Sequence, residues 1–248
     1  MTMKHVGVLA LAMGLVVGMT AAAQPEGEGW VSMFNGEDLT GWRTEAPEDW
    51  SVVDGVIDCD PTIGPGDRSL WSEESLSDFE LHVEWRFKET SGDYPMPVVL
   101  PDGSHAVDDD GNVVTIMRPN ADSGIFLRGL PKAQVNIWCW PIGSGEVYGY
   151  RMDANMPAEV RAGVTPLGNA DKPVGEWNTF LITMHGDNLT VVLNGVRVID
   201  DVPLPDVPAE GPIALQHHGG LNPETGERTG ADSLIEFRNI YYRPIDGE

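Results

Sequence analysis

The chain has 248 residues, with 15 Lys and Arg against 39 Asp and Glu, and a formal net charge of −24 at pH 7. A surface this acidic repels nucleic acids and anionic membranes, which excludes both as partners. The two cysteines, Cys59 and Cys139, are too few for a disulfide scaffold, and the sequence leaves open whether they pair.

Residues 1–23 have the layout of a secretory signal peptide. Lys4 precedes a short apolar run, and the segment ends in three alanines before Gln24. We therefore expect residues 24–248 to be the mature protein, exported to the periplasm or the cell exterior. An uncleaved membrane anchor is the alternative, although the apolar run is too short to favour a stable span.

Alternating polar and apolar residues predict short strands along the mature chain. The clearest run is 79–87, and 180–185 and 189–193 follow around a Gly-Asp turn. Asn194-Gly195 is the signature of a type I′ hairpin, and further strands are expected at 212–217 and 234–242. Many short strands between Gly- and Pro-rich turns predict an all-β sandwich of two antiparallel sheets, of the jelly-roll type.

Residues 91–121 interrupt this pattern with two turn signals, Asp102-Gly103 and Asp110-Gly111. We interpret this segment as a protruding hairpin inserted between two sheet strands. Its Asp108 to Asn112 run is superficially like a calcium loop, but the bidentate Glu of an EF-hand is missing. An acidic hairpin tip is the favoured interpretation.

The run Gln134-Val-Asn-Ile-Trp-Cys-Trp140 alternates strictly. Its first face carries Gln134, Asn136, Trp138 and Trp140, whereas Cys139 lies on the apolar face, which favours a buried free thiol. Amides can bond to sugar hydroxyls, and indoles can stack on the C–H faces of a pyranose. The alternative for the two tryptophans is that they pack beneath the 91–121 hairpin. For the amides we favour binding, because burying an unpaired amide is costly.

An ordered series of segments resembles the 3-keto-disaccharide hydrolase family over nearly the whole mature chain. These segments are WVSMFNGEDLTGW (30–42), WSVVDGVID (50–58), DFELHVEWRF (78–87), DSGIFLRG (122–129), GEWNTFLITMHGDNLTVVLNG (175–195), GPIALQHHG (211–219) and IEFRNI (235–240). The resemblance implies a concanavalin-like jelly roll that acts on glycosides whose sugar ring is already oxidised at C3. No cofactor is implied.

The implied chemistry has a physical rationale. A ketone at C3 acidifies the hydrogen on C2, so a base can remove it, the C1 substituent can leave, and water can add to the double bond. Such a site needs a base, donors for the enolate oxygen and an acid for the leaving oxygen. The Glu-x-Asp-x-x-Glu strand of jelly-roll glucanases is absent, which disfavours ordinary glucanase activity.

The sequence departs from its relatives at the amide pair. Many relatives carry Glu-x-Gln where this chain has Gln134-Val-Asn136, so a potential base has become an amide. Glu146 stands where relatives usually have a small residue, and it is our candidate to restore the missing carboxylate. The alternative is a surface acid.

Two further strands supply candidates. Arg128 ends the SGIFLRG run and is predicted to stabilise the enolate, with Asp122 either orienting it or shaping the turn. Glu84 and Arg86 share one face of their strand, and together with Arg128 they could form a ladder of ion pairs along the substrate face.

Gln216 and His218 share a face at the end of the 212–217 strand, with His217 on the other. Relatives usually read Gln-Asp-His-Gly here, so His218 matches the family and is the second candidate base. No spacing indicates a metal site, although His218 with Glu146 or Glu84 could hold a divalent ion. The predicted partner is a carbohydrate; the rival prediction is a non-catalytic carbohydrate-binding module.

Overall fold

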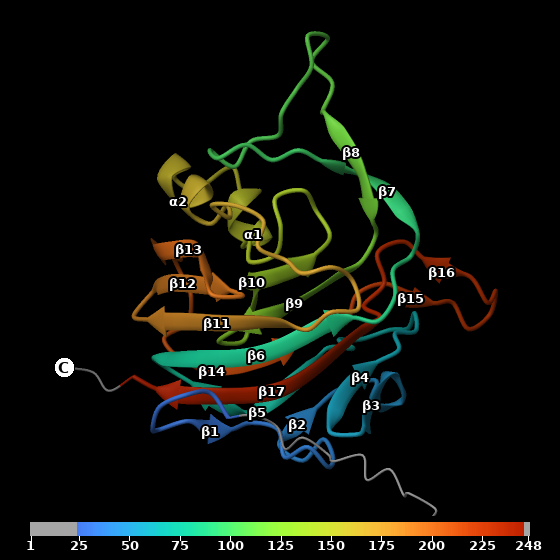
Figure 1. Cartoon of the computed structure of the whole chain (residues 1–248), viewed down its shortest axis with the longest axis vertical. Helices are drawn as coiled ribbons and strands as arrows, with labels where there is room; N and C mark the ends of the chain where they lie inside the picture. The colour runs from blue at the N-terminus through green and yellow to red at the C-terminus, as the bar shows by residue number, and fades with distance from the viewer. Residues whose placement is uncertain (1–23, 246–248) are drawn as a thin grey trace, which may run out of the picture.

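The computed structural model describes residues 24–245, so the predicted signal peptide lies outside the described residues. Two antiparallel sheets pack face to face (Figure 1). This arrangement confirms the predicted all-β sandwich. Among residues 24–245, no helix is long and apolar enough to cross a membrane.

The larger sheet has eight strands in the order β13-β12-β11-β6-β17-β4-β3, with β1 also paired to β17. Its strands are β1 (Val31–Ser32), β3 (Trp50–Val53), β4 (Val56–Cys59), β6 (Phe79–Phe87), β11 (Asn178–His185), β12 (Asn188–Leu193), β13 (Val196–Pro203) and β17 (Ile235–Pro244). The smaller sheet has the order β10-β9-β14-β5-β2. Its strands are β2 (Trp42–Arg43), β5 (Leu70–Leu76), β9 (Asp122–Leu127), β10 (Leu130–Trp138) and β14 (Gly211–Leu215).

Short elements connect these sheets. They are the 3₁₀ turn η1 (Pro47–Asp49), the helices α1 (Tyr148–Arg151) and α2 (Ala158–Gly163), and two ribbons, β7 (Asp93–Pro97) with β8 (Thr115–Pro119) and β15 (Gly220–Leu221) with β16 (Arg228–Thr229).

Strand β6 has the bounds that its alternation predicts, and its apolar side chains are all buried in the core between the sheets. The hairpin between β12 and β13 turns at Asn194 and Gly195, whose φ angles of 52° and 82° are those of a type I′ turn. The predicted 134–140 strand ends at Trp138, and the predicted 212–217 strand ends at Leu215. Both ends lie at the candidate site described below.

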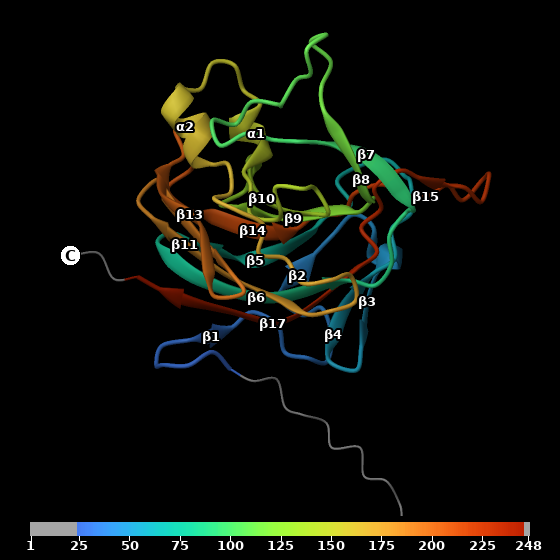
Figure 2. The ribbon, with the colours of Figure 1, turned by 45° about the horizontal axis from the view of Figure 1, so that its top comes forward.

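The segment that carries α1 and α2 bridges the edge strands of the two sheets, because α1 packs on β10 and α2 packs on β13 (Figures 1 and 2). In the middle of the smaller sheet, β10 and β14 flank β9, and five of the six β9 residues are buried although they alternate between two faces. A strand covered on both sides loses the polar alternation that marks a half-exposed one.

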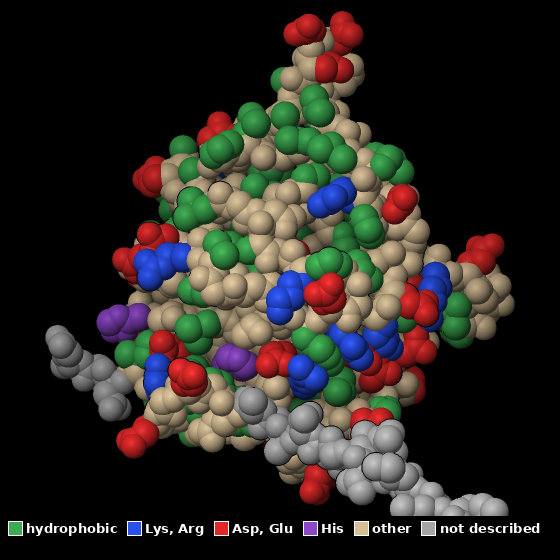
Figure 3. Space-filling view, in the orientation of Figure 1, with side chains coloured by type: hydrophobic (Ala, Val, Ile, Leu, Met, Phe, Trp, Pro, Cys, Tyr) green, Lys and Arg blue, Asp and Glu red, His purple; other side chains and the backbone are tan. Residues whose placement is uncertain are grey.

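Segment 91–121 contains the β7–β8 ribbon, which projects from the sandwich between β6 and β9 (Figure 1). At its tip, the Asp108 carboxylate accepts the backbone N–H groups of Asp110 (3.0 Å) and Asn112 (2.8 Å). This use of the carboxylate is that of a turn-shaping residue. Figure 3 shows acidic side chains gathered at this tip.

The two cysteines carry free thiols. Cys59 is buried in β4 of the larger sheet, whereas Cys139 follows β10 of the smaller one. Burial raises the pKa of the Cys139 thiol to about 12, so it stays protonated at neutral pH.

Candidate active site

The outer face of the smaller sheet brings two predicted amides together. In the β10–β9 register, Gln134 lies opposite Phe126 and Asn136 lies opposite Gly124. The backbone N–H of Gln216 donates to the Gly124 carbonyl at 2.8 Å, which places Gln216 on the far side of β9. Gln134 and Gln216 thus reach toward each other across Gly124.

The two amides form a fixed pair. Gln134 Nε2 donates to Gln216 Oε1 at 2.5 Å and to the Ser123 carbonyl at 3.1 Å. Gly124 makes room for this contact, because a Cβ there would lie 2.2 Å from Gln134 Nε2. Both glutamines are half-buried, and Gln134 Oε1 and Gln216 Nε2 have no partner among the described residues. One free acceptor and one free donor remain for a polar ligand.

Asp122 and His218 lie at one end of this face and are linked through Ser233. The Ser233 hydroxyl donates to the backbone carbonyl of Asp122 at 2.7 Å and accepts the backbone N–H of His218 at 2.8 Å. Burial raises the pKa of the Asp122 carboxyl to about 7, against the opposing effect of nearby His218. Asp122 can therefore exchange a proton near neutral pH.

A cleft of about 390 Å³ adjoins the amide pair. Phe126, the register partner of Gln134, forms one wall, and Trp71 packs beside it at 5.7 Å between ring centroids. Further lining comes from Pro131, Arg68 and His217. The site therefore combines an amide pair, an apolar wall and titratable groups, which is the usual make-up of a small-ligand site.

The tryptophans do not present open faces to this site. Trp138 is 3 % exposed and stacks on Trp140, with ring centroids 4.1 Å apart and planes 4° apart. Tyr148 packs edge-on against both, and Trp138 Nε1 donates to the Gly143 carbonyl. The predicted stacking of Trp138 on sugar is therefore wrong, and the packing partners come from the segment after β10 rather than from the 91–121 hairpin.

Glu146 also lies beside the site without facing it. Its backbone carbonyl accepts the Asn136 N–H at 2.9 Å, but its side chain is fully buried and ion-paired with Arg151. Burial raises the pKa of Glu146 to about 7, and Arg151 opposes the shift. The prediction that Glu146 replaces the missing catalytic carboxylate is not supported, because the surrounding chain seals it from ligand. Asn136 is likewise buried.

Arg128 is far from the predicted role. It is 2 % exposed at the β9–β10 turn, at the opposite end of β9 from Asp122. Its guanidinium donates to the carbonyls of Ser77, Gly186 and Pro208 and pairs with Asp78. These contacts use the guanidinium to hold neighbouring loops together, so the prediction that Arg128 contacts the enolate is wrong.

Glu84 lies on the outer face of β6 in the other sheet. It accepts from Arg238 Nε at 2.7 Å, and Arg86 pairs with Glu236 on the neighbouring strand. The ion pairs observed here join β6 to β17, so the predicted ladder of Glu84 and Arg86 with Arg128 is wrong, and these pairs do not line the amide pair. Glu84 is therefore not a substrate ligand of this site.

The site also contains residues that the sequence analysis missed. Asp49, Arg68 and His217 form a hydrogen-bonded network beside the cleft. The adjacency of His217 to His218 was the available signal, but strand alternation assigned it to the wrong face. Within residues 24–245, no three His, Cys, Asp or Glu side chains converge as metal ligands would.

The architecture is that of the concanavalin-like jelly rolls. Two solved structures from Parabacteroides distasonis ATCC 8503, both provisionally designated glycosyl hydrolases, share it. One is 16% identical with a TM-score of 0.54 and covers 88% of this chain and 95% of its own. The other is 22% identical with a TM-score of 0.52 and covers 88% of this chain and 84% of its own.

Residues 29–243 match the 3-keto-alpha-glucoside-1,2-lyase-like domain, and the chain belongs to that family. The match confirms the resemblance found in the sequence, and it supports a carbohydrate-active function. No curated protein is detectably similar to this chain.

Proposed function

We propose that this protein cleaves the glycosidic bond of 3-keto-glycosides, by abstraction of the C2 proton, elimination of the C1 substituent and hydration of the double bond. Family membership supports the substrate class. The observation that carries the proposal is the Gln134–Gln216 pair, held across Gly124 beside a cleft.

The amide pair suits an oxidised sugar ring. The free N–H of Gln216 can donate to the C3 oxygen, which becomes negatively charged as C2 loses its proton, and the free oxygen of Gln134 can accept from a ring hydroxyl. Preorganised donors of this kind stabilise a developing oxyanion. Gln216 thereby takes the role that the sequence analysis assigned to Arg128.

A group able to exchange protons near neutral pH lies next to the amides: the Asp122 carboxyl, whose pKa burial raises to about 7. Asp122 and His218 stand at one end of the face, where the Ser233 hydroxyl bonds to the backbone of both. An elimination needs only one well-placed base and one proton donor, whereas a glycosidase acting on an unmodified sugar needs two carboxyl groups at a set separation.

A binding module is the second candidate function. It is favoured by one observation, which is that Gln134 stands where many relatives carry an acid. In that case the amide pair and cleft would bind sugar without chemistry.

The test is incubation of the purified protein with a chromogenic 3-keto-glucoside and, separately, with its unoxidised parent. We expect release of the chromophore from the ketone alone, and a loss of kcat/KM of about 10²-fold in Gln216→Ala, since one oxyanion donor is removed. If the protein binds sugar saturably but releases no chromophore from either compound, the proposed enzymatic function is wrong and the binding module is the remaining candidate.

A further inference from the structure

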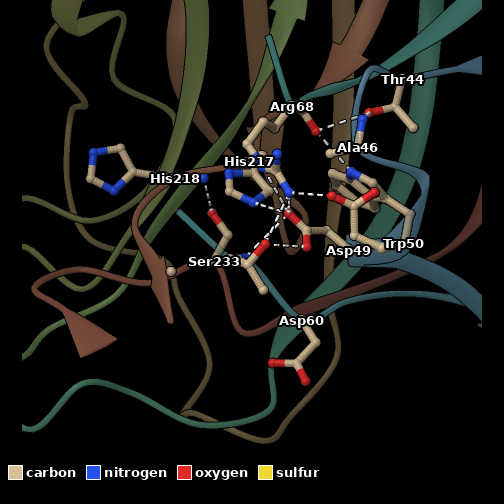
Figure 4. A network of polar contacts seen from close by, with 12 residues as sticks. Thr44, Ala46, Asp49, Trp50, Asp60, Arg68, His217, His218 and Ser233 are labelled. Atoms are coloured by element: carbon tan, nitrogen blue, oxygen red, sulfur yellow. Dashed lines mark hydrogen bonds and ion pairs between the residues drawn. The ribbon is translucent and has the colours of Figure 1, made fainter. Parts of the chain in front are cut away.

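His217 and His218 are neighbours in the chain, but their rings point apart. Figure 4 shows His217 turned toward Asp49 and Arg68, whereas His218 points away from them. His217 Nε2 lies 2.8 Å from Asp49 Oδ2, and the His217 side chain is only 6 % exposed. The network is thus built around an Asp–His pair at the edge of the cleft.

Asp49 is held firmly as a carboxylate. Its side chain is fully buried and accepts hydrogen bonds from the Thr62 hydroxyl (2.8 Å) and from Arg68 Nη2 (2.8 Å) and Nε (3.0 Å). Although burial acts to raise the pKa of Asp49, the bonds from Thr62 and Arg68 outweigh it and lower the pKa.

The charge on Asp49 determines the tautomer of His217. A carboxylate can only accept, so Nε2 must carry the proton, and the neutral ring keeps its lone pair on Nδ1. Nδ1 has no hydrogen-bond partner among residues 24–245. His217 lines the cleft whose wall is Phe126, so this ring borders the space into which a substrate bound by the amide pair would extend.

Burial is the main influence that favours a neutral His217 ring. Burial lowers its pKa, as do Arg68 and His218, while Asp49 opposes them. A base of this kind accepts a proton and then has its positive charge stabilised by the carboxylate behind it.

We propose that His217 is the base of the reaction, positioned by Asp49; this inference rests on the proposed function. Nδ1 takes the proton from C2, and the electron pair of the C–H bond moves toward the C3 carbonyl oxygen. As the C1–O bond breaks, the imidazolium returns its proton to the leaving oxygen. The ring then takes a proton from the water that adds to C1 and delivers it to C2, which restores the neutral ring and completes a net hydrolysis.

His218 is less suited to this task. It is exposed, and its Nδ1 lies 2.6 Å from the Ala231 carbonyl, to which it must donate. No side-chain carboxylate accepts a hydrogen bond from it among the described residues. The structure thus moves the predicted base from His218 to its neighbour.

The test compares wild type, His217→Gln and a matched control, His185→Gln, whose histidine is 66 % exposed in the larger sheet. Two rates are measured with a chromogenic 3-keto-glucoside in D₂O: release of the chromophore, and exchange of the C2 hydrogen followed by NMR. We expect His217→Gln to lose about 10²- to 10⁴-fold in both rates, because a base contributes that much. His185→Gln should keep both rates and the melting temperature.

Chemical rescue separates a base from a structural residue. Imidazole added to His217→Ala should restore part of the exchange rate, since removal of a side chain that lines the cleft leaves room for it there, whereas it should not affect wild type. In Asp49→Asn, the acid limb of the kcat/KM profile should move to lower pH, because the charge that favours the imidazolium is gone.

The outcomes distinguish the two proposals. If wild type is active and His217→Gln keeps its rates within threefold, or if imidazole fails to rescue a folded His217→Ala, His217 is not the base and the proposed function stands. If wild type itself neither exchanges C2 hydrogen nor releases the chromophore, both proposals fall.

Discussion

Burial prevents the carboxyl group of Glu146 from taking the catalytic role that the sequence predicted for it. It is fully buried against Arg151, one of its oxygens has no partner, and its pKa is raised from 4.5 to about 7. The folded protein therefore binds a proton that the unfolded chain releases. The bound proton contributes fully to the free energy of unfolding below about pH 4.5, and this contribution is lost as the pH rises through 7.

Replacing Glu146 with Gln should remove this pH dependence, because the amide keeps the shape of the protonated acid. Between pH 5 and pH 8, we expect the free energy of unfolding of wild type to fall by about 2 kcal/mol more than that of Glu146→Gln. Urea denaturation across this pH range measures it. Glu159→Gln, at an exposed position of α2, is the control. If the free energies of unfolding of wild type and Glu146→Gln changed equally with pH, the expectation would be contradicted.

At the scale of elements, three strands of the smaller sheet create the site through their register. β10 and β14 flank β9, and Gly124 at the centre lets Gln134 of β10 meet Gln216, which directly follows β14. A one-residue slip of β10 would turn Gln134 into the core.

Gly124→Ala should separate the amide pair without unfolding the sheet. The new Cβ would lie 2.2 Å from Gln134 Nε2, and the flexible glutamine would move away from Gln216. We expect KM for the 3-keto-glucoside to rise about 10-fold, as one oriented hydrogen-bonding pair is lost. Gly168→Ala is the matched control, since nothing lies within 4 Å of its Cβ position and its φ is not strained. An unchanged KM in Gly124→Ala would show that the pair does not bind substrate.

For the whole molecule, charge is the dominant feature. The chain carries 39 acidic against 15 basic residues, and acids crowd exposed regions such as the projecting tip (Figure 3). Repulsion among like charges opposes the compact state, whereas salt screens it over a Debye length of about 10 Å at 0.1 M.

Added salt should therefore stabilise the protein. We expect the melting temperature to rise by about 3 °C or more between roughly 0.01 M and 0.5 M NaCl, with KCl giving the same result because screening is nonspecific. Scanning calorimetry measures it. A fall in melting temperature would instead mean that surface ion pairs such as Glu84–Arg238 contribute more than the repulsion costs.

Alternation and turn chemistry determined much of the fold from the sequence alone. β6 and the Asn194-Gly195 hairpin follow from local rules, because the strand period of two and the φ preferences of Asn and Gly act between near neighbours. The same rule placed Gln134 and Gln216 each on the polar face of its own run, and the structure brings the two together. The ordered motifs also identified the family.

Only the tertiary structure decided which polar residues reach the site. Arg128 and Glu146 are as polar in sequence as Gln134, but covering segments bury both, and Glu84 lies in the other sheet. His217 escaped prediction because its orientation depends on Asp49, 168 residues away in the chain. Burial and long-range pairing arise when distant segments pack together, so no local pattern encodes them.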